Sequence, residues 1–134
     1  MSNRKGLVNV RISRDYFDEN AHLSNTAYTK YFEIGRLELI GLYGLDAYSL
    51  KERNLGLYIK KSEYEYLKSI NNVWNVNIKS EFERCEKGAR INLRQKMIWG
   101  EQCFAESFIE QVLVNLKTGK PIRIPQDIVE LLNS

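Results

Sequence analysis

Residues 18–36 read DENAHLSNTAYTKYFEIGR, a polar loop that turns into the most strongly helical segment of the chain. Apolar residues recur there with the i, i+3, i+4, i+7 spacing of an amphipathic helix; they are Tyr28, Tyr31, Phe32, Gly35, Leu39, Ile40 and Leu42. Gly35 costs about 1 kcal/mol of helix propensity relative to Ala, so we expect close backbone approach to another element there. The pattern predicts one long buried helix over residues 26–43, with a carboxylate and hydrogen-bonding residues just before it.

The rest of the chain alternates with the period-two pattern of β-strands. We expect strands at residues 7–13, 58–67, 74–82, 91–99 and 102–116. In the third of these, one face carries Trp74, Val76, Ile78, Ser80 and Phe82. Gly44 favours a helix end, and residues 86–88 predict a hairpin turn. Short helices are expected within residues 46–54 and after Pro125. One strand, one long helix and then a run of antiparallel strands predict an α+β fold, a curved sheet wrapped around the helix.

Composition restricts the classes of function. The 134 residues fit a single domain, and 43% hydrophobic and 28% charged residues are ordinary for a globular protein. A net charge of +3 without clustered basic residues argues against a nucleic-acid binder. No apolar run approaches the roughly 20 residues of a membrane span, and no signal peptide is evident. Cys85 and Cys103 are isolated, so we expect no metal, no cofactor and a cytoplasmic location.

The order of elements and the opening stretch resemble the hotdog-fold acyl-CoA thioesterases, in particular the 4-hydroxybenzoyl-CoA thioesterase-like family. That family carries the pattern D-x-x-G-H-x-x-N-x-x-Y, followed by E-x-x-R in the helix. The matching positions here are Asp18, His22, Asn25, Tyr28, Glu33 and Arg36. The similarity covers nearly the whole chain, 1–134, including the strand that leads to residues 116–121. It implies a hotdog fold and thioester hydrolysis.

Two positions depart from the family pattern. Ala21 stands where the family has Gly, which puts the loop conformation or the site in question. Residues 68–70 stand where the family has a Pro after the tyrosine-rich strand.

The resemblance implies roles for Asp18 and for the backbone amide of Asn25, whereas a role for His22 is suggested by its residue type. Asp18 acts on the thioester, either by direct attack or as a general base for water. The backbone amide of Asn25 polarises the thioester carbonyl, because a helix N-terminus favours developing negative charge. His22 orients the loop or touches substrate, with a structural hydrogen bond as the equal alternative. Glu33 and Arg36, three apart, are expected to form an ion pair rather than to do chemistry.

Substrate contacts are predicted from residue type. Tyr28 and Tyr64, together with Tyr58, Tyr66 and Trp74, are candidates for an acyl or aromatic pocket, with a place in the core as the alternative. The phosphates of coenzyme A would be held by basic residues beside the hairpin turn, namely Arg84, Lys87 and Arg90, with a solvated hairpin end as the alternative. Glu63 and Glu65 are candidates for a second carboxylate, although strand carboxylates commonly face solvent.

Three functions remain open. The first is a thioesterase for an aromatic or fatty acyl-CoA, and the second is one for acyl groups on a carrier protein. The third is a hotdog module that binds acyl ligands without hydrolysing them. The resemblance implies a homodimer or homotetramer with sites between subunits, and an exposed sheet edge makes such pairing physically sensible.

Overall fold

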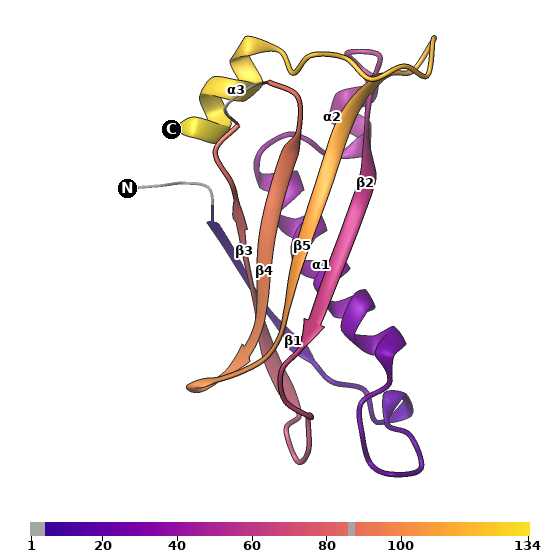
Figure 1. Cartoon of the computed structure of the whole chain (residues 1–134), viewed down its shortest axis with the longest axis vertical. Helices are drawn as coiled ribbons and strands as arrows, with labels where there is room; N and C mark the ends of the chain where they lie inside the picture. Colours follow the sequence, from indigo (N-terminus) through magenta and orange to yellow (C-terminus); the bar gives the residue numbers. More distant parts are fainter. Residues whose placement is uncertain (1–4, 86–87) are drawn as a thin grey trace.

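One curved antiparallel sheet and one long helix form the body of the protein (Figure 1). The computed structural model describes residues 5–85 and 88–134. The strands are β1 (Lys5–Arg11), β2 (Leu55–Tyr66), β3 (Asn75–Phe82), β4 (Ile91–Trp99) and β5 (Gln102–Asn115). Their order in the sheet is β1-β3-β4-β5-β2, with every neighbouring pair antiparallel. The helix α1 (Asn25–Leu42) packs on one face, so the predicted α+β arrangement is confirmed.

The core lies between α1 and the sheet because β3 and β4 each turn one apolar face toward the helix. Alternate residues of β3 and β4 are buried against the helix; they are Val76, Ile78, Ser80, Phe82, Ile91, Leu93, Gln95 and Met97. Three short helical segments complete the chain, η1 (Arg14–Tyr16), α2 (Ala47–Lys51) and α3 (Gln126–Asn133). In the described part of the chain no helix is both long and apolar enough to cross a membrane.

Gly35 has the close contact that the sequence predicts. A Cβ atom at Gly35 would lie 2.9 Å from Cβ of Ile78, closer than real side chains approach. Beside it, the buried Gln95 donates from Nε2 to the carbonyl of Phe32 at 2.8 Å and to Oγ of Ser80 at 2.9 Å. Ser107 Oγ in turn donates to Gln95 Oε1 at 3.0 Å. The middle of α1 is therefore fixed on the sheet by steric fit and by a buried polar network.

Two predicted core positions are wrong. Leu42, the last residue of α1, is 67% exposed, while the residue after it, Tyr43, packs on Phe82 of β3 with ring centroids 5.1 Å apart, so Leu42 is on the side of the helix that faces away from the sheet. Trp74 is 42% exposed, because β3 begins only at Asn75 and the residue before it leaves the strand alternation. The predicted hairpin turn at residues 86–88 lies partly outside the described residues.

The sheet has two distinct ends. At one end lie the loop of residues 12–24, the start of α1, the end of β2 and the start of β3 (Figure 1, lower end). At the other end lie the end of β3, the start of β4, α2 and α3 (Figure 1, upper end). We call the first the α1-start end. We call the second, where β3 ends and β4 begins, the hairpin end.

Candidate active site

The loop before α1 folds into a small hairpin. Phe17 forms an antiparallel bridge with Leu23, and the Ser24 amide donates to the carbonyl of Tyr16 at 2.7 Å. At its tip the Asp18 amide donates to the carbonyl of His22 at 2.8 Å. The hairpin therefore holds Asp18 opposite His22 and delivers the chain directly into the first turn of α1.

The carboxylate of Asp18 is fixed by backbone amides. Its Oδ1 accepts from the amide of His22 at 3.0 Å and from that of Asn20 at 2.9 Å. These bonds, His22 first, hold the pKa of Asp18 below the ordinary value of 3.8. Asp18 is exposed in the single chain. It is thus an ionised, oriented carboxylate at neutral pH.

Ala21 keeps the backbone conformation that favours Gly. Its φ is +60°, in the left-handed region. Its amide donates to the carbonyl of Asp18 at 3.0 Å, which closes the turn. The substitution of the family Gly therefore leaves the turn in the left-handed form and adds strain to it.

The N-terminus of α1 is open. Ser24 occupies the N-cap position without making a side-chain capping bond, and the first turn contains no acidic residue. The first amides of the helix, beginning at Asn25, are therefore not satisfied by a side chain of the cap. Such an end favours a ligand atom that carries negative charge.

A pocket of about 500 Å³ lies beside this helix start. It is lined by His22, Leu23, Asn25, Tyr28 and residues 66–70; we call it the α1 pocket. Tyr66, the last residue of β2, donates its hydroxyl to Oδ1 of Asn25. Its ring meets Tyr28 edge to face, with ring centroids 5.0 Å apart. Burial raises the pKa of both phenols, so Tyr66 stays a donor at neutral pH.

The structure brings together only some of the predicted residues. His22, Asn25 and Tyr28 share the α1 pocket, and Asp18 lies on the same hairpin without lining it. Residues 67–70 were not predicted as lining residues. The sequence did contain a signal for these residues, namely the departure from the family pattern at residues 68–70, because this segment forms part of the wall of the α1 pocket.

The other predicted contacts lie elsewhere. Tyr64 packs against Phe32, with ring centroids 5.9 Å apart, in the core. Arg84 and Arg90 flank the hairpin end, and Arg90 lies 3.6 Å from Glu110 in an ion pair. Lys87 lies outside the described residues. The eight residues of β3, about 26 Å of strand, lead from the α1-start end to the hairpin end, and Arg84 follows β3, so Arg84 lies at the opposite end of the strand from the α1 pocket of the same chain.

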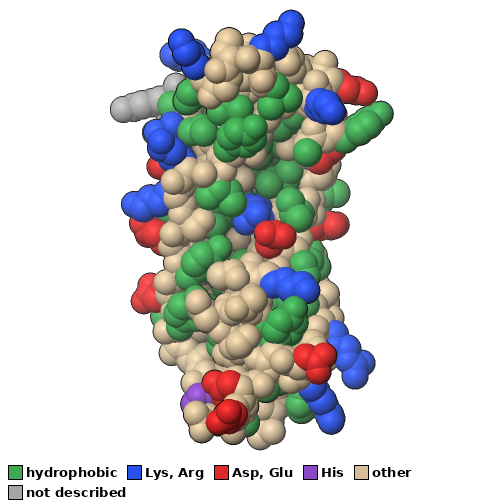
Figure 2. All heavy atoms as spheres, turned by 90° about the vertical axis from the view of Figure 1, so that its right-hand side faces the viewer, with side chains coloured by type: hydrophobic (Ala, Val, Ile, Leu, Met, Phe, Trp, Pro, Cys, Tyr) green, Lys and Arg blue, Asp and Glu red, His purple; other side chains and the backbone are tan. Residues whose placement is uncertain are grey.

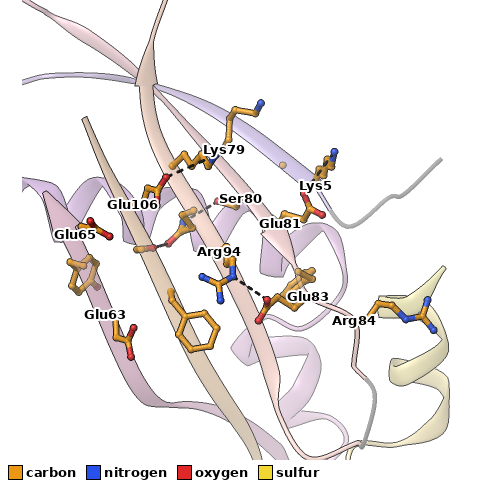
Figure 3. Close-up of a pocket in the computed structure, with 17 residues that line it drawn as sticks. Lys5, Glu63, Glu65, Lys79, Ser80, Glu81, Glu83, Arg84, Arg94 and Glu106 are labelled. Atoms are coloured by element: carbon orange, nitrogen blue, oxygen red, sulfur yellow. Dashed lines mark hydrogen bonds and ion pairs between the residues drawn. The ribbon is translucent and has the colours of Figure 1, made fainter. Parts of the chain in front are cut away.

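A hollow of about 970 Å³ lies over the sheet and is lined by Tyr64 and Arg84 among others (Figure 3). Many of its charged side chains neutralise one another. Arg94 lies 3.0 Å from Glu83, and Lys96 lies 4.0 Å from Glu106. Glu63, a candidate second carboxylate, lies 2.7 Å from Lys61. The α1 pocket is the smaller of the two, but it lies beside a helix terminus, and the oriented carboxylate of Asp18 is on the hairpin that leads into that helix.

Glu33 and Arg36 form the predicted ion pair, at 3.8 Å on one face of α1. Within residues 5–85 and 88–134, no group of three or more His, Cys, Asp or Glu side chains is arranged to hold a metal ion.

Solved structures share this fold. A probable thioesterase from Bartonella henselae is 24% identical, with a TM-score of 0.77 over 90% of this chain and 99% of that one. A DHNA-CoA thioesterase from Staphylococcus aureus is 18% identical, with a TM-score of 0.75 over 89% of this chain and 80% of that one. A hypothetical protein from Staphylococcus aureus in complex with CoA is 12% identical, with a TM-score of 0.81 over 98% of this chain and 84% of that one.

At these identities the likeness shows the fold, which is the predicted hotdog fold. No curated protein has a sequence that matches this chain significantly. The family profile described as the Thioesterase-like superfamily matches residues 13–132, which include the Asp18 hairpin, α1 and all strands except β1. The chain therefore belongs to the Thioesterase-like superfamily and is a thioester hydrolase.

Proposed function

We propose that the protein hydrolyses an acyl-CoA to the free acid and CoA at the α1 pocket. One observation carries this proposal: a single hairpin joins an oriented, ionised Asp18 to a helix N-terminus without a side-chain cap. The carboxylate supplies the base or nucleophile, and the helix amides stabilise negative charge on the carbonyl oxygen. The Staphylococcus aureus neighbour in complex with CoA supports a CoA thioester as the substrate class.

Two routes lead from the acyl-CoA and water to the free acid and CoA. As a general base, Asp18 takes a proton from water, and the resulting hydroxide attacks the carbonyl carbon. As a nucleophile, Asp18 itself attacks that carbon, and water later cleaves the mixed anhydride. In both routes the oxyanion forms near the amide of Asn25, the carbon–sulfur bond breaks and the thiolate of CoA takes a proton.

The aromatic wall of the α1 pocket suits the acyl group. Tyr28 and Tyr66 present ring surface beside Asn25, with Leu23 and Ile70 at their side. Such walls accept an aromatic or a fatty acyl chain. The hydroxyl of Tyr66 holds the Asn25 side chain, so that this side chain is drawn toward β2.

A second copy of the chain would complete the site. Asp18 is exposed in the single chain, whereas thioester chemistry gains from water-poor surroundings. The edge strand β2 is twelve residues long and leaves Tyr58 54% and Ile59 47% exposed. Beside it a groove of about 660 Å³ runs along α1, lined by Leu37, Ile40 and Leu57 among others. Figure 2 shows hydrophobic side chains over much of this face.

We therefore propose a homodimer or homotetramer that buries this face. Sedimentation velocity on the full chain tests the assembly. We expect a dimer or a tetramer, and a monomer that keeps full activity would remove the shared-site proposal. The cytoplasm remains our proposal for the compartment, in keeping with two free cysteines.

Carrier-bound acyl groups are the alternative substrates, and binding without hydrolysis is the third possibility. The open N-terminus of α1 favours hydrolysis over binding alone, because acyl binding has no need of an oxyanion site.

A panel of aromatic and fatty acyl-CoAs, followed by release of free thiol, tests the proposal. We expect turnover of at least one of them. Turnover of acyl groups only on a carrier protein would select the alternative, and turnover of neither would contradict the proposed function.

A further inference from the structure

A buried arginine lines the groove between α1 and the edge strand β2. Arg36, in the middle of α1, is only 8% exposed. Within residues 5–85 and 88–134 it is the only charged residue among the buried side chains. Charged side chains are rarely buried unless a partner neutralises them. The surroundings of Arg36 should therefore indicate what its guanidinium group binds.

The guanidinium group of Arg36 has little bonding inside the chain. Its Nη2 lies 3.8 Å from Oε2 of Glu33, beyond hydrogen-bond distance, and the Glu33 side chain is 58% exposed. No other polar contact of this guanidinium is found in the described part of the chain. The other buried polar side chains all take part in hydrogen bonds; they are Ser80, Gln95, Ser107 and Gln111. Since arginine has five N–H donors, the hydrogen-bonding capacity of Arg36 is largely unused.

Apolar side chains form most of the rest of this groove, whose volume is about 660 Å³. We call it the α1–β2 groove. Ile40, Leu45 and Leu55 are buried in it, whereas Leu37 and Leu116 are 54% and 39% exposed. Sites for small molecules commonly measure about 300–1,000 Å³ and have apolar walls with a few polar groups. A cation beside an apolar wall is complementary to a ligand with an anionic head and an apolar body.

The other charged residues of the groove leave it positive. Asp46 and Lys51 line it together with Arg36. The Asp46 carboxylate already caps α2, because its Oδ2 accepts from the Ser49 amide at 3.1 Å. Lys51 forms no ion pair with any residue that the structure describes. An anion in the groove would therefore meet two cations and one carboxylate that is engaged elsewhere.

The proposed assembly increases the need for an anion at Arg36. A second copy that covers this face would remove the water that now reaches the guanidinium group. A charge that is cut off from water without a partner is strongly unfavourable. An apolar hollow enclosed in the same interface would also lack van der Waals contacts unless it were filled. A carboxylate with an apolar body would supply both the opposite charge and the filling.

We propose that the α1–β2 groove binds a monocarboxylate with an apolar body, such as a fatty acid of medium length. The carboxylate binds the guanidinium group of Arg36, and the chain lies on Ile40, Leu45 and Leu55. This ligand is distinct from the thioester at the α1 pocket, because a thioester group carries no carboxylate. Arg36 also lies eleven residues beyond Asn25, roughly 16 Å along the helix of the same chain. Binding in the groove does not depend on the proposed hydrolysis.

Calorimetry on the full chain, with dodecanoate kept below its micelle concentration, is the first test. We expect dodecanoate to bind, and dodecan-1-ol, which has the same chain without the charge, to bind about tenfold more weakly or less. Arg36→Met should raise the dissociation constant for dodecanoate about tenfold or more, and Arg36→Lys should fall in between. Arg11→Met, an exposed position on the opposite edge strand β1, is the matched control and should bind unchanged.

Glu33 allows a test in the opposite direction. Its carboxylate lies 3.8 Å from the guanidinium group and competes with a ligand for it. Glu33→Gln should therefore lower the dissociation constant for dodecanoate severalfold, and this gain should disappear in an Arg36→Met background. Glu38→Gln, which changes an exposed carboxylate on the same helix, should have no effect. Unchanged binding in Glu33→Gln and in Arg36→Met would overturn the inference.

Sedimentation velocity with and without dodecanoate identifies what occupies the groove. We expect the same assembly in both conditions. Dissociation of the assembly as dodecanoate binds would show that the second copy itself fills the groove, which would overturn the inference. Absence of binding, or equal binding of dodecanoate and dodecan-1-ol, would overturn it as well. These comparisons use the unsubstituted chain, so they decide the question even if Arg36→Met does not fold.

Kinetics separate this inference from the proposed function. If dodecanoyl-CoA is hydrolysed, Arg36→Met should leave its KM unchanged. A raised KM would assign the groove to the substrate, which would overturn the inference and leave the proposed function standing. Binding of dodecanoate that depends on Arg36, without hydrolysis of any acyl-CoA in the panel, would support the groove site and contradict the proposed function.

Discussion

The middle of α1 is packed tightly on the sheet, whereas its N-terminus is open and has no side-chain cap. At Gly35 the helix lies so close to the sheet that an added Cβ would collide with Ile78. Beside it the buried side chain of Gln95 donates to the carbonyl of Phe32 in α1 and accepts from Ser107. At Asn25 the helix begins without a side-chain cap, behind a strained turn whose carboxylate is exposed. The packed middle of α1 fixes the position of its open N-terminus, so the residues proposed for catalysis at that end are held by a rigid scaffold.

The most severe effect is expected at the open end. Asp18→Asn keeps an oxygen for the amides of Asn20 and His22 and removes the base or nucleophile. We expect kcat to fall roughly a thousandfold, about 4 kcal/mol, with ligand binding and folding largely kept. Steady-state kinetics measure this, with Glu19→Gln as the control on the neighbouring exposed carboxylate. Equal turnover in Asp18→Asn and the unsubstituted chain would move the chemistry to another group.

Substitutions in the packed middle of α1 should change the free energy of unfolding. Gly35→Ala forces a methyl group against Ile78, so we expect a loss of about 2–3 kcal/mol in the free energy of unfolding. Gly41→Ala on the same helix meets nothing within 4 Å and should gain up to about 1 kcal/mol. Urea denaturation of both variants measures the contrast. A stable Gly35→Ala protein would show that the helix and the sheet can separate there at little cost.

Tyr66 links the edge strand to the open helix end. Tyr66→Phe removes the hydroxyl that donates to Asn25 Oδ1 and keeps the ring on Tyr28. We expect kcat to fall about tenfold, about 1.4 kcal/mol, with KM nearly unchanged. The same substitution in an Asn25→Ala background should have little further effect on kcat, while Tyr48→Phe, on exposed α2, serves as the control. Additive losses would show that Tyr66 acts independently of Asn25.

The smallest effect is expected at Ala21. Because its φ is +60°, Ala21→Gly should relieve strain and raise the free energy of unfolding by about 0.5–1 kcal/mol. Ala27→Gly, at a fully buried helical position in α1, should instead lower it by about 1–2 kcal/mol, because it costs helix propensity and removes a buried methyl group. Thermal or urea unfolding compares the two. A loss of stability in Ala21→Gly would mean that the methyl group has a contact that offsets its strain.

The packed region was predictable because its signals are local and periodic. The spacing of Tyr28, Phe32 and Leu39 predicted the helix, and Gly35 predicted the close contact that Ile78 now explains. Periodicity did not show which side chains an element exposes near its ends. Leu42 and Trp74 continue the apolar pattern in sequence but are 67% and 42% exposed, although Tyr43, the residue after Leu42, packs on Phe82.

The open region was predicted in part. The family pattern pointed to Asp18, His22 and Asn25, which the structure places on one hairpin at the helix start. The bond between Tyr66 and Asn25 joins residues 41 positions apart, and no local pattern encodes which turn of a helix a strand end reaches. For the same reason the sequence could not place Arg84 and Arg90 relative to the α1 pocket, which lies at the other end of β3 in the same chain.

The central claim is that an ionised Asp18, held by backbone amides, acts on a thioester polarised at the start of α1. Its most direct test is the pH dependence of kcat/KM with a hydrolysed acyl thioester, in brief assays that precede acid unfolding. Because two backbone amides hold the pKa of the Asp18 carboxyl below its ordinary value, the carboxylate stays charged in mildly acidic solution, so activity should be kept there and fall only as the carboxylate is protonated. An acid limb close to neutral pH, together with loss of activity in His22→Gln, would instead make His22 the essential base and contradict the claim.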